Sequence, residues 1–268
     1  MKVNYIEKGN KSANTVIFLH ACGVSSWMWY EQENAFKDYH CIYIDLPQHG
    51  ESLRSGKFTI NNAAESVVEI IKKKANNSKA ILIGHETGAK VALDVLKKHK
   101  ELIGGVVLSS VTLRSQFEAK LHKIIPHKWM IGIFKLKYKV MKYEWYRKIA
   151  IEAYGITGEN NIKKYLDELV MYSPDQLLDI ITESFIKPFY MDKLKGIEVP
   201  TLILVGEKEL KAVTESAKDL GKLFINSEIF TIRGGNQNHP RQCYDQFNSI
   251  VKGWIENKLD LNESFKMD

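Results

Sequence analysis

The chain has 268 residues, of which 44% are hydrophobic, 26% charged and 10% aromatic. This composition is typical of a globular protein and excludes disordered, collagen-like and small disulfide-rich classes. The net charge is a modest +6, and the longest apolar runs fall far short of the roughly 20 residues that a membrane-spanning helix needs. We therefore expect a cytoplasmic protein without stable membrane anchoring.

Six short apolar runs alternate with helical patterns along the chain. The runs predict buried strands, over Thr15–His20, Cys41–Asp45, Ala80–His85, Gly105–Val111, Thr201–Val205 and Glu228–Arg233. Apolar residues at three-and-four spacing predict two helices, over residues 64–71 and 91–96. Two further helices are expected over Glu215–Leu223 and Tyr244–Asn257. The alternation predicts an α/β fold, in which a mostly parallel sheet is covered by helices on both faces.

One long segment interrupts this alternation. Residues 115–190 contain no buried strand pattern, only helical patterns rich in lysine and aromatic residues. We interpret them as a helical cap inserted over the carboxyl edge of the sheet, where ligands bind in such folds. The predicted organisation is therefore a core domain of residues 1–114 and 191–268 with a cap domain of residues 115–190.

The excess of basic over acidic residues is concentrated in one stretch of the cap segment. The stretch from Lys120 to Lys148 contains nine basic residues and one acidic residue, Glu144, so its net charge is 9 − 1 = +8. One interpretation is a solvated helical face, and another is a pocket border that attracts an anionic ligand. The stretch matches no nucleic-acid-binding module, so we expect no nucleic-acid partner.

The three cysteines, Cys22, Cys41 and Cys243, lie far apart and match no metal-ligand spacing. We expect reduced thiols, and neither a metal site nor a bound cofactor.

Five local patterns occur in the order found in one enzyme family. They are His20-Ala21-Cys22-Gly23, Asp45-Leu46-Pro47-Gln48-His49-Gly50-Glu51-Ser52, Gly84-His85-Glu86-Thr87-Gly88, the strand ending at Glu209, and Gly234-Gly235-Asn236-Gln237-Asn238. Together they resemble the α/β-hydrolase superfamily, in particular small bacterial cap-bearing carboxylesterases and lipases. The resemblance implies an oxyanion loop, a nucleophile elbow between a strand and a helix, an acid and a histidine loop, in that order.

The sequence departs from this family at the residues that perform hydrolysis. The elbow position is Glu86, the histidine position is Gln237, and only the acid position, Glu209, keeps a usable residue. A serine hydrolase needs an alcohol that an adjacent imidazole activates. The sequence therefore predicts a degenerate triad.

The resemblance places Glu86 in a pocket beneath the cap. The backbone N–H groups of Cys22 and Thr87 are expected to form the oxyanion hole, with Ala21 and Trp27 beside the substrate. Those N–H groups would lower the pKa of Glu86, whereas burial would raise it. Glu86 is accordingly a structural carboxylate, a general acid or base, or a covalent nucleophile. The last role needs a base for water, for which His239, two residues beyond Gln237, is a candidate restrained by Pro240.

Two classes of function follow. The first is an enzyme that acts on a small, largely apolar molecule, one option being a molecule with a carboxylate, by lyase, isomerase or cyclase chemistry with Glu86 as general acid or base. The second is a non-catalytic ligand-binding protein, or an inactivated form of a Ser-His-Glu carboxylesterase. The expected partner is a small molecule in each case, and the sequence does not indicate the oligomeric state.

Overall fold

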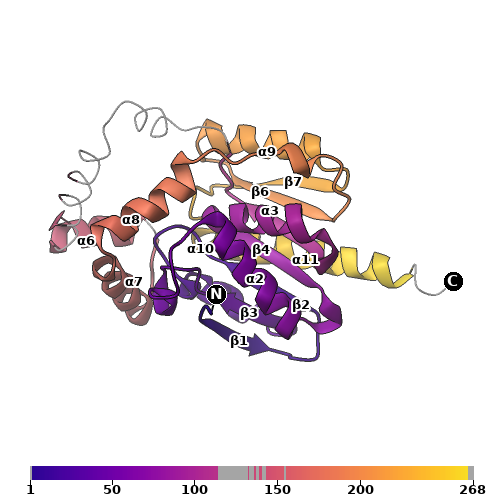
Figure 1. The fold of residues 1–268 in the computed structure, drawn as a ribbon, viewed down its shortest axis with the longest axis horizontal. Coiled ribbons are helices and arrows are strands. Elements are labelled where there is room, and N and C mark those ends of the chain that lie inside the picture. Colours follow the sequence, from indigo (N-terminus) through magenta and orange to yellow (C-terminus); the bar gives the residue numbers. More distant parts are fainter. Residues whose placement is uncertain are drawn as a thin grey trace.

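The protein forms a seven-stranded sheet between two layers of helices (Figure 1). The computed structural model describes residues 2–113, 132, 136, 139, 140, 143–153 and 155–264. The strand order is β1-β3-β2-β4-β5-β6-β7. The strands are β1 (Tyr5–Gly9), β2 (Thr15–Leu19), β3 (His40–Ile44), β4 (Ala80–His85), β5 (Ile103–Ser109), β6 (Thr201–Gly206) and β7 (Ser227–Ile232).

All neighbouring strands are parallel except β1, which pairs antiparallel with β3. The prediction of a mostly parallel sheet is therefore confirmed, and the six predicted strands correspond to β2 through β7. Strand β1 lies at the sheet edge and its residues are half-buried or exposed. It lacks an apolar run because an edge strand is not covered on both faces.

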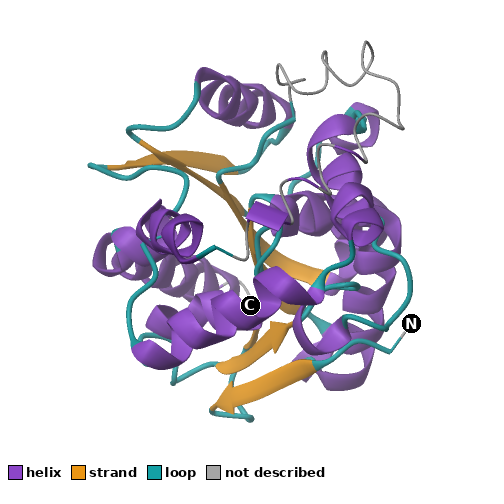
Figure 2. Cartoon of the chain, turned by 90° about the vertical axis from the view of Figure 1, so that its left-hand side faces the viewer, coloured by secondary structure: helices purple, strands orange, loops and turns teal. Residues whose placement is uncertain are grey.

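Helices cover both faces of this sheet, as the sequence predicts (Figure 2). They are α1 (Tyr30–Glu33), α2 (Ile60–Lys74), α3 (Thr87–His99), α6 (Glu144–Ala153), α7 (Glu159–Met171), α8 (Pro174–Ile181), α9 (Lys211–Leu223), α10 (His239–Gln242) and α11 (Tyr244–Ser264). Side chains of α2, α3 and α9 pack in one apolar cluster, and those of α11 pack in another on the opposite face.

The two apolar clusters follow from alternation along the central strands. In β2, Ile17 and Leu19 point into the first cluster, whereas Val16 and Phe18 point into the second. The Phe18 ring stacks on Tyr43 with 4.6 Å between ring centroids. Because both faces are buried, successive residues of a central strand are all apolar. Burial of both faces holds the central strands in place, and with them the strand ends that carry the candidate site residues.

Between β5 and β6, the described residues form α6, α7, α8 and the π-helix Thr182–Ile186. The helices lie beyond the carboxyl ends of the parallel strands, at the end of the molecule opposite α11's final turns (Figure 1). Helix α8 begins with a capping box between Ser173 and Gln176, with Pro174 in its first turn. The boundaries of a cap domain at 115 and 190 remain a prediction.

Much of the basic stretch Lys120–Lys148, including all of residues 120–131, lies outside the described residues. Within the described part of the chain, no helix is long and apolar enough to cross a membrane.

Candidate active site

A sharp turn between β4 and α3 carries Glu86. Its φ of 51° and ψ of −105° lie outside the helical and extended regions, a conformation that costs on the order of 1–3 kcal/mol for a residue with a side chain. Gly84 and Gly88 make the turn sterically feasible. A Cβ on Gly84 would lie 2.5 Å from the Gly88 carbonyl oxygen, and one on Gly88 would lie 2.1 Å from that of Leu19. The turn thus has the geometry of a nucleophile elbow, with a carboxylate where the nucleophile stands.

Both carboxylate oxygens of Glu86 accept hydrogen bonds. The backbone N–H of Cys22 donates to Oε2 at 3.0 Å, and the side-chain amide of Gln237 donates to Oε1. The residues that the resemblance places at the nucleophile and histidine positions therefore contact each other directly. The Cys22 N–H is one of the two backbone donors that the resemblance assigns to an oxyanion hole, and here it donates to Glu86.

Burial dominates the electrostatics of this carboxyl group. Glu86 is only 8% exposed, and burial raises its pKa to about 7, against smaller lowering effects from the Cys22 N–H, the charge of Lys90 and the Gln237 amide. Of the two opposing influences named from the sequence, desolvation is the larger. Glu86 consequently exchanges a proton near neutral pH.

Lys90 is a buried cation one helical turn beyond Glu86. Its Nζ donates to the main-chain carbonyl of Ser184 in the π-helix. Burial lowers the pKa of Lys90 to about 8, and the negative charge of Glu86 raises it. The sequence contains a signal for this neighbour, because residues four apart on a helix share a face.

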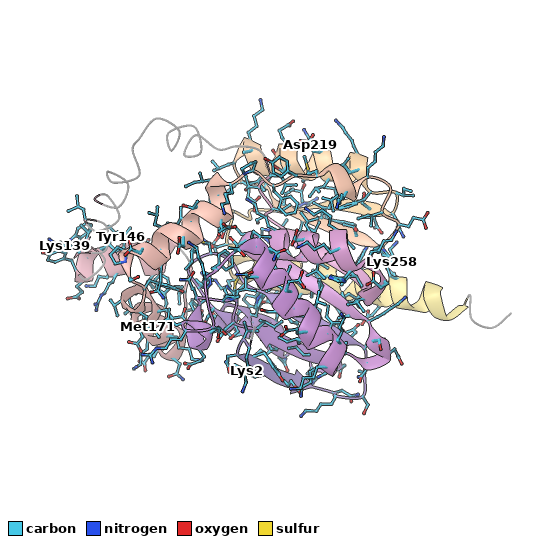
Figure 3. The ribbon with its side chains drawn as sticks, in the orientation of Figure 1. Lys2, Lys139, Tyr146, Met171, Asp219 and Lys258 are labelled. Atoms are coloured by element: carbon cyan, nitrogen blue, oxygen red, sulfur yellow. The ribbon has the colours of Figure 1, made fainter. Side chains whose placement is uncertain are left out.

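A cavity of about 390 Å³ opens onto the elbow. Ala21, Cys22, Glu86 and Gln237 line it from the strand ends. Aromatic and aliphatic side chains line it from the helices between β5 and β6, namely Tyr146, Tyr165, Tyr172, Leu177, Ile181 and Phe185. Figure 3 places Tyr146 and Met171 in this helical segment, at the opposite end of the molecule from Lys258. The cavity has the size and apolar lining of a small-molecule site.

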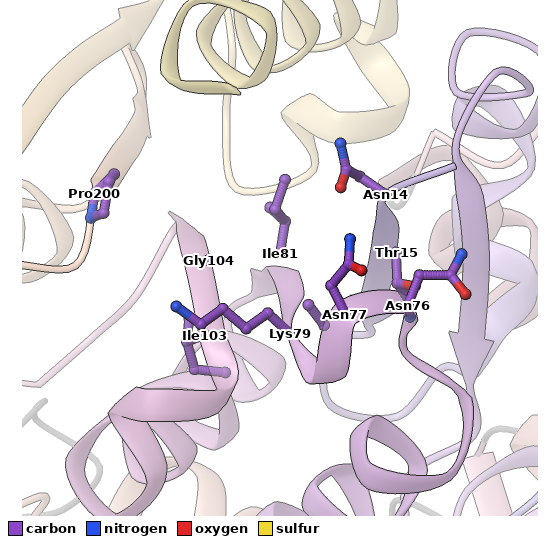
Figure 4. Close-up of a pocket in the computed structure, with 10 residues that line it drawn as sticks. Asn14, Thr15, Asn76, Asn77, Lys79, Ile81, Ile103, Gly104 and Pro200 are labelled. Atoms are coloured by element: carbon purple, nitrogen blue, oxygen red, sulfur yellow. The ribbon is translucent and has the colours of Figure 1, made fainter. Parts of the chain in front are cut away.

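A second cavity, of about 370 Å³, lies at the amino ends of the strands (Figure 4). Its lining includes Asn14, Asn76 and Asn77, and Lys79 is the one titratable side chain among the described lining residues. It lacks a pair of acid and base groups. The cavity at the elbow is therefore the candidate active site.

The three residue types of a hydrolytic triad do meet, behind the elbow rather than at it. Nε2 of His239 lies 3.1 Å from Oγ of Ser110 and 3.2 Å from Oγ of Ser109. The Ser110 hydroxyl donates to Oε1 of Glu209, which lies 3.7 Å from the same Nε2. The side chains of His239 and Glu209 are 0% and 1% exposed. His239 thus lies in a buried cluster and does not line the elbow cavity.

The connections within this cluster differ from those of a working triad. A catalytic histidine contacts the acid through one ring nitrogen and the serine through the other. Here Ser110 and Glu209 approach the same nitrogen of His239, and its Nδ1 has no hydrogen-bond partner among the described residues. Burial also holds the pKa of His239 well below its ordinary value. The cluster therefore lacks the relay in which the acid orients one nitrogen of a histidine while the other nitrogen activates the serine.

His85 connects the cluster to the elbow. Its Nδ1 lies 2.9 Å from Oγ of Ser109, and its ring hydrogen-bonds to the backbone of Gln237. Burial lowers the pKa of His85 to about 3, so the ring is neutral. The contact fixes the loop that positions the Gln237 amide.

The remaining predicted residues have separate positions. The Thr87 side chain is buried, and its hydroxyl has no hydrogen-bond partner among the described residues. Trp27 does not line the cavity, and its indole N–H donates to Glu168 of α7 at 2.8 Å. Ser25 donates to the other oxygen of Glu168 at 2.5 Å. Because Glu168 lies more than 140 residues beyond its partners, no sequence pattern indicates this contact between α7 and the loop after β2.

Comparison with known proteins agrees with the geometry. Residues 14–148, half of the chain, match the family described as alpha/beta hydrolase fold. The chain belongs to the α/β-hydrolase family. The predicted fold class and the resemblance to esterase- and lipase-like members are confirmed.

Several relatives cover most of the chain at low identity. An (E)-2-((N-methylformamido)methylene)succinate hydrolase of Acinetobacter baylyi is 22% identical and is matched over 94% of each chain. A pimeloyl-(acyl-carrier protein) methyl ester esterase of Vibrio cholerae is 23% identical over 80% of this chain and 84% of its own. A lipase-esterase related protein from Clostridium acetobutylicum has a TM-score of 0.71 at 23% identity and covers 94% of this chain and 99% of its own. The last likeness shows the fold.

Proposed function

We propose that this α/β-hydrolase family member is an enzyme that transfers protons on a small, largely apolar molecule, with Glu86 as the general acid or base. The chemistry is of the lyase, isomerase or cyclase type, in which a carbon–hydrogen or oxygen–hydrogen bond is made or broken. The observation that carries the proposal is the Glu86–Gln237 hydrogen bond inside the cavity.

The pairing argues against independent loss of two catalytic residues. Glu86 and Gln237 replace the family's nucleophile and histidine, and they contact each other. Gln48, where the family has glycine, has a φ of 61°, and its side-chain oxygen accepts the backbone N–H of Phe58 at 2.7 Å. Each of these departures has acquired a specific bond, which favours selection for a new site over drift.

Gln237 suits a residue that changes its protonation state. A primary amide has a donor end and an acceptor end. Ionised Glu86 accepts from the amide N–H, and neutral Glu86 donates to the amide oxygen after the amide rotates by half a turn. Gln237 therefore satisfies both states of the acid, whereas a histidine at the same position would favour the ionised state.

A covalent role for Glu86 has less support. Hydrolysis of an ester formed on its carboxylate requires an activated water. His239, the histidine nearest to Gln237 in the sequence, is 0% exposed and contacts Ser110, and burial lowers the pKa of His85 to about 3, which makes it a weak base. A non-catalytic binding protein remains the alternative, and it predicts that Glu86 has no effect on any substrate proton.

Proton transfer is measured by deuterium exchange. Small ketones with and without a carboxylate, such as levulinate and 2-heptanone, are incubated in D₂O, and loss of the proton next to the carbonyl is followed by NMR. We expect Glu86→Gln to reduce the enzyme-dependent exchange at least about 100-fold, the usual contribution of a general base. Glu168→Gln is the matched control, because Glu168 is also buried and its pKa is also raised to about 7, but it does not line the cavity. Equal rates in the two variants would refute the proposal.

A further inference from the structure

We propose that the cavity binds a ligand with a carboxylate group, which the guanidinium of Arg241 holds, while the hydroxyl of Tyr172 donates a hydrogen bond to an oxygen of the same ligand. The inference rests on the proposed function and adds a substrate class to it. Neither residue is indicated by the sequence motifs.

Arg241 brings a permanent positive charge to the cavity. It belongs to the short helix α10, is 6% exposed and lines the cavity. Among the described lining residues it is the one arginine or lysine. Its guanidinium lies over the Trp27 ring, with Cζ 5.5 Å from the centroid, a stacking contact that orients the planar group. A guanidinium fixed in this way binds a carboxylate through two parallel hydrogen bonds.

Tyr172 supplies an independent observation. Its side chain is 2% exposed and lines the cavity, and its hydroxyl has no hydrogen-bond partner among the described residues. An unsatisfied buried hydroxyl is destabilising, and a hydrogen bond to a ligand oxygen would remove that penalty. Burial raises the pKa of Tyr172 well above its ordinary value, so the hydroxyl keeps its proton and acts as a donor.

The rest of the lining determines the body of the ligand. Met28, Leu177, Ile181 and Phe185 present apolar surface to the cavity. A ligand that satisfies the whole site therefore has a short apolar body with a carboxylate.

The test compares an acid with its ester on matched variants. Binding of octanoate and of methyl octanoate is measured by calorimetry for the wild type, Arg241→Gln and Arg233→Gln. Arg233 is exposed, so its replacement removes the same charge away from the cavity. We expect the wild type to bind octanoate at least tenfold more tightly than the ester. Arg241→Gln should lose at least tenfold for octanoate and little for the ester, and Arg233→Gln should match the wild type.

Two conservative variants separate binding from folding. Arg241→Lys keeps the charge and should bind octanoate with intermediate affinity, and Tyr172→Phe keeps the ring and should weaken octanoate binding two- to tenfold. The preference for the acid should persist at 0.5 M salt, because a buried ion pair is screened less than surface charges. No binding of octanoate by the wild type, equal binding of acid and ester, or equal losses in Arg241→Gln and Arg233→Gln would each overturn the inference.

This inference and the proposed function fail separately. A wild type that prefers the acid but catalyses no deuterium exchange would contradict proton transfer alone. Exchange that depends on Glu86, without any preference for the acid, would contradict the carboxylate site alone.

Discussion

The elbow and the buried cluster behind it contain complementary parts of a hydrolase. The elbow has the strained turn, the backbone donor and the cavity, but Glu86 and Gln237 stand at the positions that the resemblance assigns to the nucleophile and the histidine. The cluster has Ser110, His239 and Glu209 in contact, but the side chains of His239 and Glu209 are fully buried. The comparison shows that catalytic residue types require both access and the correct connections, and here neither region has both.

The largest effect is expected from rebuilding hydrolysis at the elbow. Glu86→Ser together with Gln237→His places an alcohol and an imidazole in the cavity, and Oε2 of Glu209 has no hydrogen-bond partner among the described residues. We expect p-nitrophenyl butyrate hydrolysis at least about 100-fold above the wild type, because nucleophile and base act together. Each single variant should gain far less. A double variant that folds but stays inactive would show that Glu209 cannot orient a histidine at 237.

The wild type itself should be inert to serine-directed reagents. Ser109 and Ser110 are 0% and 1% exposed, and His239 does not connect them to Glu209 in the manner of a triad. We expect neither fluorophosphonate labelling nor p-nitrophenyl acetate hydrolysis above background. A labelled peptide containing Ser110 would contradict the comparison between the two regions.

The contribution of three buried carboxyl groups to the stability of the fold should fall as the pH rises from about 4.5 to about 7. Burial raises the pKa values of Glu86, Glu168 and Glu209 to about 7. In this window the native state keeps protons that the unfolded state has lost, so each group loses up to about 3 kcal/mol of its contribution. Burial lowers the pKa values of several histidines, whose contribution to stability rises over part of the same range. The carboxyl effect is therefore measured by urea unfolding at pH 5 and pH 8 of single Glu→Gln variants beside the wild type.

From pH 5 to pH 8, Glu86→Gln should lose less stability, or gain more, than the wild type, because a carboxyl whose contribution falls in this range is gone. Ser184→Ala is a suitable control. Ser184 is buried next to the site, and its replacement removes no ionisable group. An unchanged difference in Glu86→Gln would mean that Glu86 ionises as it does in the unfolded chain.

The smallest effect concerns the amide at position 237. The hydrogen bond from Gln237 lowers the pKa of Glu86, so Gln237→Leu should raise that pKa further. The pH midpoint of deuterium exchange should move upward by a fraction of a unit. The groups Lys90, Cys22 and Glu209 also act on Glu86 and stay unchanged in this variant. A downward shift would contradict the assigned donor role of the amide.

The sequence predicts the scaffold of the site well. Apolar runs locate the buried strands, and Gly84 and Gly88 around Glu86 indicate the turn between β4 and α3, because both signals are local. The sequence also identifies the opposing effects on the pKa of Glu86. It cannot give their balance, which depends on how completely the surrounding side chains exclude water.

Contacts between residues far apart in the chain cannot be predicted from local sequence patterns. Arg241 lies on Trp27, and Glu168 accepts from Trp27 and Ser25, yet no spacing or motif relates these positions. His239 illustrates the same limit. Its distance from Gln237 in the sequence is two residues, but the start of α10 directs its side chain to Ser110.

The most direct test of the account is the ionisation of Glu86 itself. Carbon-13 labelling of glutamate side-chain carboxyls, followed by NMR titration from pH 4 to pH 9, resolves the groups that titrate late. Spectra of Glu86→Gln, Glu168→Gln and Glu209→Gln assign each signal by its disappearance. The account predicts a signal with a midpoint near pH 7 that is lost in Glu86→Gln and kept in the other two. A Glu86 midpoint near 4 would show that the carboxylate is a permanent anion at neutral pH and would contradict its role as a proton donor and acceptor.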